Sequence, residues 1–563
     1  MNRKKIFIIL AVVGVIMVGI IIGIVALTQD AGKKPSQISQ EDAMSSLRNL
    51  YGQLDVQALA PVKGTVDLQT TDMKDILPDI SKYPEQVTYT TPDHVEIFSS
   101  TEKAGKGKDG WLVDMANQFN SSGATVNGKP VSVAIRGIAS GQAVDYITSG
   151  KYVPDAFSPS NELWGGLMKA KGIDVTLMEK RLTGNVAGIM LSKPAQDAIT
   201  KKYGAVNVKS VTDATTAGEI AMGYTNPFAS STGANFLMSM LYTYDNTNPL
   251  SEAATGEFVK FQANVPFVAY TTLQMKDSAA SGVLDGFVFE AQQLANSPDL
   301  ISNYAFTPFG VRHDSPVYAI GSLTDEKKQI LQQFIAFCKT PEAQRKATED
   351  GFNKNNDYAP SAEVAHMDAS KLAQAQKLWK DKKNSNKEII AVFVADTSGS
   401  MDGEPLNNLK KSLLNGSNYI SKDASVGLVT FNNDVNIALP IGKFDINQRS
   451  LFTGAVKSMS AGGSTAMYSA IVVAEKMLQD AKADHPDAKL MLFVLTDGNS
   501  NAGFTLNQCQ DMIGGLKVPI CTIGYNADLE ALQTISSINE AASINADTED
   551  VVYKIMSLFN AEM

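Results

Sequence analysis

Oxygen-bearing side chains stand at the ends of apolar runs in the last third of this 563-residue chain. One set directly follows the run 389–394, another closes the run 490–496, and a threonine comes after a Gly-Gly-Ser loop. Because the carboxyl ends of parallel strands meet at one edge of a sheet, these side chains are expected to converge. Hydroxyl and carboxylate oxygens are the ligands that hard divalent cations prefer. The residues predicted to form a metal site are Asp396, Ser398, Ser400, Thr465 and Asp497.

The spacing D-x-S-x-S, then a distant Thr, then T-D-G resembles the metal-ion-dependent adhesion site of von Willebrand factor type A (VWA) domains. The resemblance covers residues 387–563. Strand-like runs such as 425–431 and 518–524 alternate there with helix-like stretches such as 466–482. Alternation of this kind predicts a doubly wound, mainly parallel α/β domain.

The resemblance also implies a role for each of the five residues. The hydroxyls of Ser398, Ser400 and Thr465 would contact the ion, while Asp396 and Asp497 would act directly or through water. One coordination position would stay open for a carboxylate of a protein partner. Mg²⁺ is the expected ion, with Ca²⁺ and Mn²⁺ as alternatives. The competing explanation is that these residues only form turns and helix caps, which Asp, Ser and Gly also favour.

An apolar segment near the start of the chain predicts a membrane anchor. Residues 6–27 carry no charge, and at about 1.5 Å per residue a helix of this length spans roughly the 30 Å hydrocarbon layer. Ala26 and Thr28 make a poor signal-peptide cleavage site, and the basic residues 3–5 favour a cytoplasmic N-terminus. Residues 1–28 are therefore predicted to form a cytoplasmic tip and a single transmembrane helix in the cell membrane, with the large domains extracellular.

The composition argues against several classes of function. With 59 acidic and 49 basic residues the net charge is -10, which argues against nucleic acid as a partner. The four histidines show no H-E-x-x-H spacing, and neither a G-x-S-x-G elbow nor a P-loop occurs, so no enzyme activity is expected. Among the three cysteines, Cys509 and Cys521 could pair outside the cell or remain buried thiols.

A second α/β region is predicted between the two ends, over residues 93–358. A polar stretch, 29–92, precedes it as a stalk or as an N-terminal extension packed on the next domain, and a connector helix within 359–386 follows it. Trp379 gives that helix the bulk to dock on a neighbour. Hydroxyls follow several strand-like runs. At helix starts they favour a small polar or anionic ligand, unless they serve only as helix caps.

The middle region resembles bacterial extracellular solute-binding proteins of the two-lobed transport type. The matching stretches are DAFSPSNELW at 155–164, GYTNPFASSTG at 223–233, VFE at 288–290 and FIAFCKTPEAQ at 334–344. The resemblance implies two α/β lobes, a ligand cleft between them and chain crossings that act as a hinge. Glu290 would either read a positive group of the ligand or pair with a Lys or Arg of the protein. The residues placed in the cleft are Ser99, Ser100, Ser140, Ser158, Asn226, Ser231, Thr232 and Glu290.

These features predict a membrane-anchored extracellular binding and adhesion protein that has a cation in its VWA domain and a solute-binding-like module. Ligand binding would close the two lobes, shift the connector helix and change how the VWA domain presents its cation. Two alternatives stay open. The chain could be an accessory solute-binding component of a transporter, or a structural or assembly factor whose cleft has lost its ligand.

Overall fold

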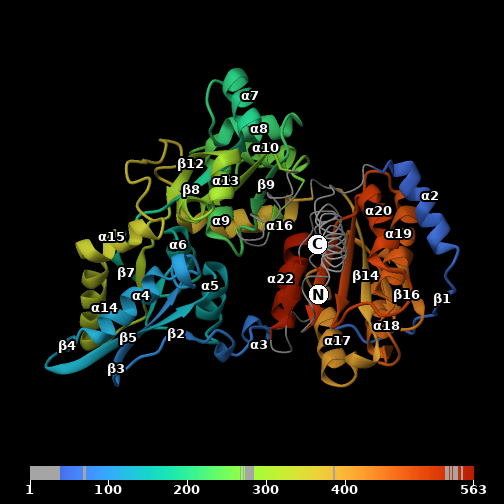
Figure 1. Ribbon diagram of the computed structural model, residues 1–563, viewed down its shortest axis with the longest axis horizontal. Coiled ribbons are helices and arrows are strands. Elements are labelled where there is room, and N and C mark those ends of the chain that lie inside the picture. Colours follow the sequence, from blue (N-terminus) through green and yellow to red (C-terminus); the bar gives the residue numbers. More distant parts are fainter. Residues whose placement is uncertain are drawn as a thin grey trace, which may run out of the picture.

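The computed structural model contains three β-sheets with helices packed on them, two in the middle region and one in the C-terminal third (Figure 1). The structure describes residues 38–67, 72–266, 268–269, 272, 275, 284–384, 387–525, 532, 535–536, 543–546 and 550–563. The predicted transmembrane segment 6–27 lies outside the described residues. Within the described ranges, no helix is both long enough and apolar enough to cross a bilayer.

The first lobe of the middle region is built on a mixed sheet of order β2-β5-β3-β6-β13-β7, with β4 paired to β5. Its strands are β2 (Glu85–Val87), β3 (Asp93–Ser99), β4 (Thr125–Val126), β5 (Lys129–Gly137), β6 (Ala156–Ser158), β7 (Val175–Glu179) and β13 (Val317–Ile320). Its helices are α4 (Trp111–Ser121), α5 (Ser140–Ser149), α6 (Leu163–Ala170), α14 (Asp325–Cys338) and α15 (Pro341–Glu349). Because β3 pairs in parallel with β6, Ser99 and Ser158 lie side by side at one edge.

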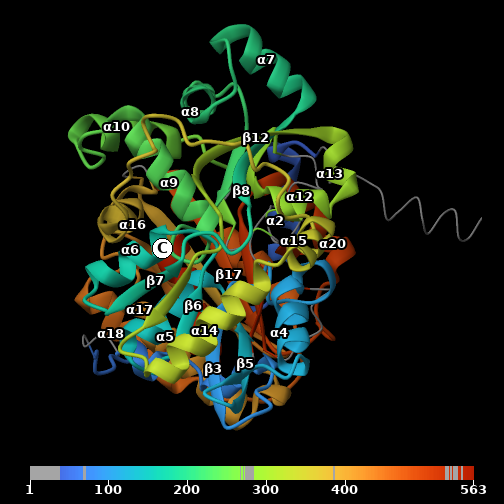
Figure 2. The same cartoon turned by 90° about the vertical axis from the view of Figure 1, so that its left-hand side faces the viewer.

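The second lobe has a sheet of order β10-β9-β11-β8-β12. Its strands are β8 (Val186–Ser192), β9 (Met222–Thr225), β10 (Val268–Ala269), β11 (Gly286–Glu290) and β12 (Tyr304–Arg312). Its helices are α7 (Lys193–Tyr203), α8 (Val208–Thr216), α9 (Ser231–Tyr244), α10 (Glu252–Gln262), α12 (Ala291–Ala295) and α13 (Pro298–Asn303). Figure 2 shows this lobe above the first one. The chain crosses between the lobes after β7 and again after β12, as the resemblance to two-lobed proteins implied.

The C-terminal third forms a doubly wound sheet of order β1-β16-β15-β14-β17-β18-β19. The strands of this third are β14 (Ile389–Asp396), β15 (Ser425–Phe431), β16 (Val435–Lys443), β17 (Lys489–Thr496), β18 (Ile520–Tyr525) and β19 (Ser543–Ala546). Its helices are α17 (Glu404–Ser417), α18 (Ile446–Ser458), α19 (Met467–Asp484), α20 (Leu506–Leu516) and α22 (Val551–Glu562). Alternate residues of β14 face opposite cores, Phe393 toward α17 and α22 and Val392 toward α19 and α20. Cys509 and Cys521 are both buried and are not joined by a disulfide.

The segment before the lobes belongs to this same C-terminal domain. Helix α2 (Gln40–Tyr51) packs on α19 and α20, and its Ala43 and Leu47 are fully buried in their apolar cluster. Strand β1 (Val56–Ala58) pairs in parallel with β16 and forms the edge of the sheet. The prediction of a stalk, or of an extension packed on the next domain, is therefore wrong for residues 40–58. The two lobes are inserted between β1 and β14 of one continuous sheet.

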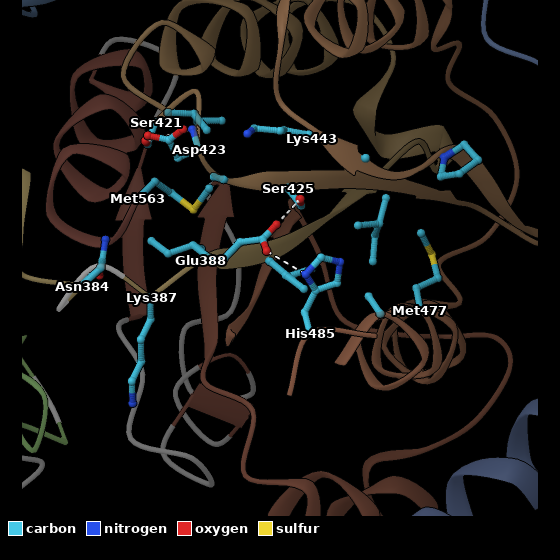
Figure 3. Close-up of a pocket in the computed structure, with 18 of the residues that line it drawn as sticks. Asn384, Lys387, Glu388, Ser421, Asp423, Ser425, Lys443, Met477, His485 and Met563 are labelled. Atoms are coloured by element: carbon cyan, nitrogen blue, oxygen red, sulfur yellow. Dashed lines mark hydrogen bonds and ion pairs between the residues drawn. The ribbon is translucent and has the colours of Figure 1, made fainter. Parts of the chain in front are cut away.

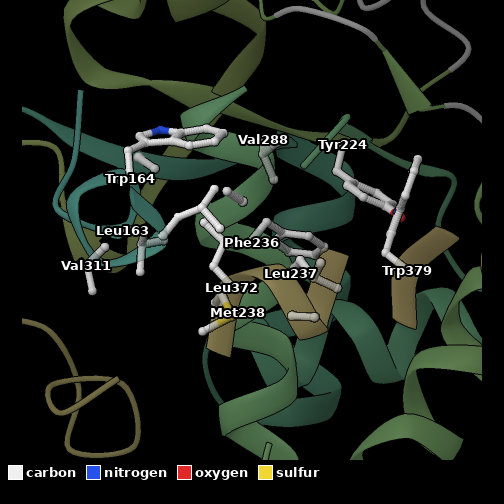
Figure 4. Packing of buried hydrophobic residues seen from close by; sticks show 14 of the residues in the cluster. Leu163, Trp164, Tyr224, Phe236, Leu237, Met238, Val288, Val311, Leu372 and Trp379 are labelled. Carbon is white, nitrogen blue, oxygen red and sulfur yellow. The ribbon is translucent and has the colours of Figure 1, made fainter. Parts of the chain in front are cut away.

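The connector forms a helix, as predicted, and it docks on the lobes. Helix α16 (Leu372–Lys382) packs against α9 of the second lobe and α6 of the first. Trp379 is fully buried and its indole N–H donates to the hydroxyl of Tyr224 on β9. Figure 4 shows these two side chains together beside the core around Phe236. The connector is thus part of the lobe core.

Candidate functional site

Strands β14 and β17 are adjacent and parallel, so Asp396 and Asp497 emerge at the same edge of the sheet. One Asp396 carboxylate oxygen accepts the backbone N–H of Ser398 at 2.7 Å, and the other accepts the hydroxyl of Thr496 at 2.5 Å. The hydroxyls of Ser398 and Ser400 lie 3.1 Å apart, and that of Ser400 donates to Asp497 at 2.9 Å. Four of the five residues of the predicted metal site are thus joined by short polar contacts.

Backbone hydrogen bonds fix the loop that carries Thr465 against both other loops. The N–H of Gly399 donates to Gly463 and that of Gly462 donates to Thr397, each at 2.9 Å. On the other side, the carbonyl of Thr465 accepts the hydroxyl of Ser500 at 2.9 Å. The structure therefore places the fifth predicted residue on a loop that touches the loops of the other four.

The electrostatics of this edge favour a cation. Asp396 is fully buried, and burial together with the charge of Asp497 raises its pKa, against the hydrogen bonds from Thr496 and Ser398. Ser400 is exposed and Asp497 partly exposed, so the edge grades from a buried carboxylate to solvent. Two carboxylates with neighbouring hydroxyls fit a hard divalent ion. The described ranges hold no group of three or more His, Cys, Asp or Glu side chains suited to a metal.

The eight residues predicted to line the cleft between the lobes are all buried. Contacts between the lobes cover Ser231. Trp164 of the first lobe donates its indole N–H to the hydroxyl of Ser231 in the second lobe at 2.8 Å, and Asn161 donates to the Ser231 carbonyl at 3.2 Å. The hydroxyls of Ser140 and Ser158 have no hydrogen-bond partner among the described residues.

Glu290 forms hydrogen bonds with both chain segments that cross between the lobes. One carboxylate oxygen accepts the hydroxyl of Thr232 and the Nδ1–H of His313, both at 3.0 Å, and the other accepts the amide of Asn185 at 2.8 Å. The Nε2 of His313 faces the side-chain amide nitrogens of Asn161 and Asn235, so it must be the acceptor, and Nδ1 carries the proton. These contacts hold Glu290 at the hinge, and its predicted role toward a positive group of a ligand stays a prediction.

A lysine that the sequence reasoning missed fills part of the predicted cleft. Lys103 is fully buried, and its ammonium donates to the carbonyl of Ser158 at 2.9 Å and to the hydroxyl of Ser100. Burial lowers its pKa, while the charges of Glu102 and Glu290 raise it. The predicted pairing of Glu290 with a Lys or Arg is thus present only as this electrostatic effect of Lys103, and the direct partner of Glu290 is His313. The position of Lys103 in the hydroxyl-rich loop after β3 was the available signal.

A cavity of about 1280 Å³ lies at the opposite edge of the C-terminal sheet (Figure 3). Glu388, at its centre, accepts the hydroxyl of Ser425 at 2.6 Å and pairs with His485 at 2.8 Å. No residue of the predicted sites lines this cavity. Glu388, Ser425 and His485 thus pair within the cavity, and its lining does not include the site around Asp396.

Two family models match this chain. The model of the von Willebrand factor type A domain matches residues 391–557, and the model of the bacterial extracellular solute-binding protein matches residues 104–353. Both matches lie in the parts of the fold described above. They agree with the two resemblances inferred from the sequence.

Curated relatives match only short segments. Inter-alpha-trypsin inhibitor heavy chain H3 of Bos taurus is 28% identical over 150 residues, which is 24% of this chain and 16% of the relative. Uncharacterized protein sll0103 of Synechocystis sp. is 27% identical over 111 residues, which is 20% of this chain and 25% of the relative. The chain therefore spans a quarter or less of the length of these two relatives.

Solved structures are similar to parts of this chain at low identity. Iron-bound HitA from Pseudomonas aeruginosa is 14% identical, with a TM-score of 0.37, over 52% of this chain and 99% of that one. The von Willebrand factor type A structure from Catenulispora acidiphila is 19% identical, with a TM-score of 0.29, over 31% of this chain and 42% of that one. The family models therefore identify a von Willebrand factor type A domain at residues 391–557 and a bacterial extracellular solute-binding domain at residues 104–353 of this chain.

Proposed function

We propose that this chain is a membrane-anchored extracellular binding protein whose VWA domain holds a divalent cation, Mg²⁺ first, to bind an acidic group of a protein partner. The observation that carries the proposal is the convergence of Asp396, Ser398, Ser400 and Asp497 within hydrogen-bond distance at one sheet edge. Thr465 lies on the adjoining loop. The bound ion would supply an outward positive charge for a partner's carboxylate.

The buried and the exposed residues of the metal site have different roles. Asp396 is held by Thr496 and by the N–H of Ser398, which fixes its carboxylate from the buried side. Ser400 is exposed and leaves the outer side open to a partner. The hydroxyls of Ser398 and Ser400 bond to each other and to Asp497, with no His or Lys base in those contacts, so we propose binding and not catalysis.

Calorimetric titration of the full chain with Mg²⁺ and with Mn²⁺ tests this proposal. Asp396→Ala and Ser400→Ala should each weaken the binding at least about tenfold, because each removes an oxygen of the site. The control is Asp423→Ala, an exposed carboxylate in the loop before β15, at the opposite edge of the sheet. Equal affinity in the wild type and both site variants would reject the site.

A second candidate function is binding of a small polar or anionic solute between the lobes, as a sensor or as a transporter component. The observation that favours it is the pair of buried hydroxyls of Ser140 and Ser158, which lack partners among the described residues. An unpaired buried hydroxyl costs free energy that a ligand could recover.

The Ser158→Ala variant distinguishes a cleft that binds a solute from a cleft that has lost its ligand. In a thermal-shift screen of small anions and polar metabolites, a true ligand should raise the melting temperature of the wild type more than that of the variant. If no solute shifts the wild type and Ser158→Ala is itself more stable, the cleft has no ligand and the structural alternative is the better account.

A further inference from the structure

Helix α22, the last element of the VWA domain, carries two apolar faces. Ile555, Leu558 and Phe559 are buried with β14 and α17 in the core of the VWA domain. Tyr553 and Met556 are each 4% exposed, and they belong to the apolar cluster of the lobes. Figure 1 shows α22 between the VWA sheet and α5 of the first lobe. A single helix therefore contributes to the cores of both domains.

Polar contacts strengthen this junction on the side of the first lobe. The hydroxyl of Tyr553 donates to the carboxylate of Asp145 on α5 at 2.9 Å. Burial raises the pKa of Asp145 to about 6, with partial relief from Lys171 and from the Tyr553 hydrogen bond. Separation of α22 from α5 would expose the apolar contacts and break this bond.

The second lobe and the connector reach the same helix. A cavity of about 200 Å³ is lined together by Val144 of the first lobe, Phe228 of the second, Gln376 of the connector and Met556 of α22. At the end of the connector, burial lowers the pKa of Lys383 to about 7, against the opposing charge of Glu562 on α22. The amine of Lys380 lies 5.4 Å from the ring of Tyr419 in the VWA domain.

The chain connectivity adds to these contacts, because the lobes are inserted between β1 and β14 and two chain segments join them to the VWA domain. We propose that α22 couples the VWA domain to the lobes, so that cation binding at the sheet edge stabilises the inserted unit. The part of this inference that concerns the cation rests on the proposed function. By reciprocity, the arrangement of the lobes then changes the affinity for the ion.

Tryptophan fluorescence of the full chain separates the two domains. All three tryptophans, Trp111, Trp164 and Trp379, lie in the lobes or the connector, so their signal reports only the inserted unit. Without metal, the wild type should lose its tryptophan signal in the same thermal transition that calorimetry detects for the whole chain. Met556→Asp, which places a charge in the shared core, should split that transition into two.

Leu177→Asp is the matched control, because it makes the same kind of change at an apolar side chain that is 46% exposed on β7. It should leave one transition. If Met556→Asp does not fold, Tyr553→Phe, which removes the hydrogen bond to Asp145, should separate the melting temperature of the tryptophan signal from that of the calorimetric transition. Separate transitions in the wild type would overturn the coupling, whatever the metal does.

The metal then tests the direction of the coupling. At about 100 times its dissociation constant, Mg²⁺ should raise the tryptophan-detected melting temperature of the wild type by about 3 °C. Met556→Asp should still bind the ion by calorimetry and show no such rise. Metal binding without a rise in the wild type would also overturn the coupling. Absence of metal binding together with a single wild-type transition would refute the proposed function and keep the domain coupling.

Discussion

A fully buried carboxyl group sets a measurable pH dependence of stability. Glu475 lies on α19, has 0% exposure, and neither of its carboxyl oxygens has a hydrogen-bond partner among the described residues. Burial raises its pKa from 4.5 to about 8, against the opposing effect of the Gln479 side chain, which lowers it. The folded protein therefore holds a proton on Glu475 at neutral pH, which the unfolded chain has lost.

The sign and size of the effect follow from linkage. Below pH 4.5 both states are protonated, and Glu475 contributes no pH dependence. Between pH 4.5 and 8 the folded state keeps the proton, so the free energy of unfolding falls by about 1.4 kcal/mol per pH unit. At pH 7 the accumulated loss is about 3 kcal/mol. Above pH 8 both states are ionised and the loss stays constant.

Glu475→Gln removes this titration while keeping the shape of the side chain. The stability of the variant relative to the wild type should rise by about 3 kcal/mol between pH 5 and pH 7. Urea unfolding followed by circular dichroism at several pH values measures it. Asp480→Asn, at a 63% exposed carboxylate on the same helix, is the control and should show little change with pH. A difference between Glu475→Gln and wild type that stays constant from pH 5 to 7 would refute the reasoning.

Two further predictions concern how the parts fit together. Gly141→Ala should separate the lobes, because a Cβ there would lie 2.0 Å from the backbone oxygen of Phe228 across the cleft, and small-angle X-ray scattering should give a larger radius of gyration. The control Gly256→Ala, whose Cβ would have nothing within 4 Å, should keep the wild-type radius, and equal radii in all three proteins would count against a closed contact at this point. Leu47→Ala on α2 should lower the free energy of unfolding of the VWA domain by about 2–5 kcal/mol in urea, since the leucine is fully buried on α19 and α20. Ser45→Ala, at an exposed position of α2, should change this free energy little, and a loss below about 1 kcal/mol for Leu47→Ala would mean that α2 is not part of that core.

Local patterns were sufficient to predict the elements around the metal-site residues. Strand β14 is a continuous apolar run that ends at a carboxylate, and a strand buried on both faces has this composition. The sites at Asp396 and Asp497 could be placed on one edge because parallel neighbours end together. The connector helix with its buried Trp379 followed from helix-forming residues and one bulky side chain. The metal itself remains a proposal.

Pairings across long sequence separations could not be predicted. Strand β1 has only three residues, each partly or fully exposed, so it gives no periodic signal, and its partner Val435 is far along the chain. The hydrogen-bond partners of Glu290 could not be predicted for a similar reason. Its donors Asn185 and His313 lie on two chain crossings that meet only after both lobes have folded.

The sequence by itself determined the two domain families, the oxygen-rich residues at the sheet edge and the hydroxyl-rich loops between the lobes, because each depends on residues close together in the chain. Only the tertiary structure decided that residues 40–58 complete the VWA domain, that the lobes are inserted in it, and that α22 lies in both cores. Apolar burial has no direction along the sequence, so a short strand or one helix face pairs with whichever complementary surface the rest of the fold brings to it.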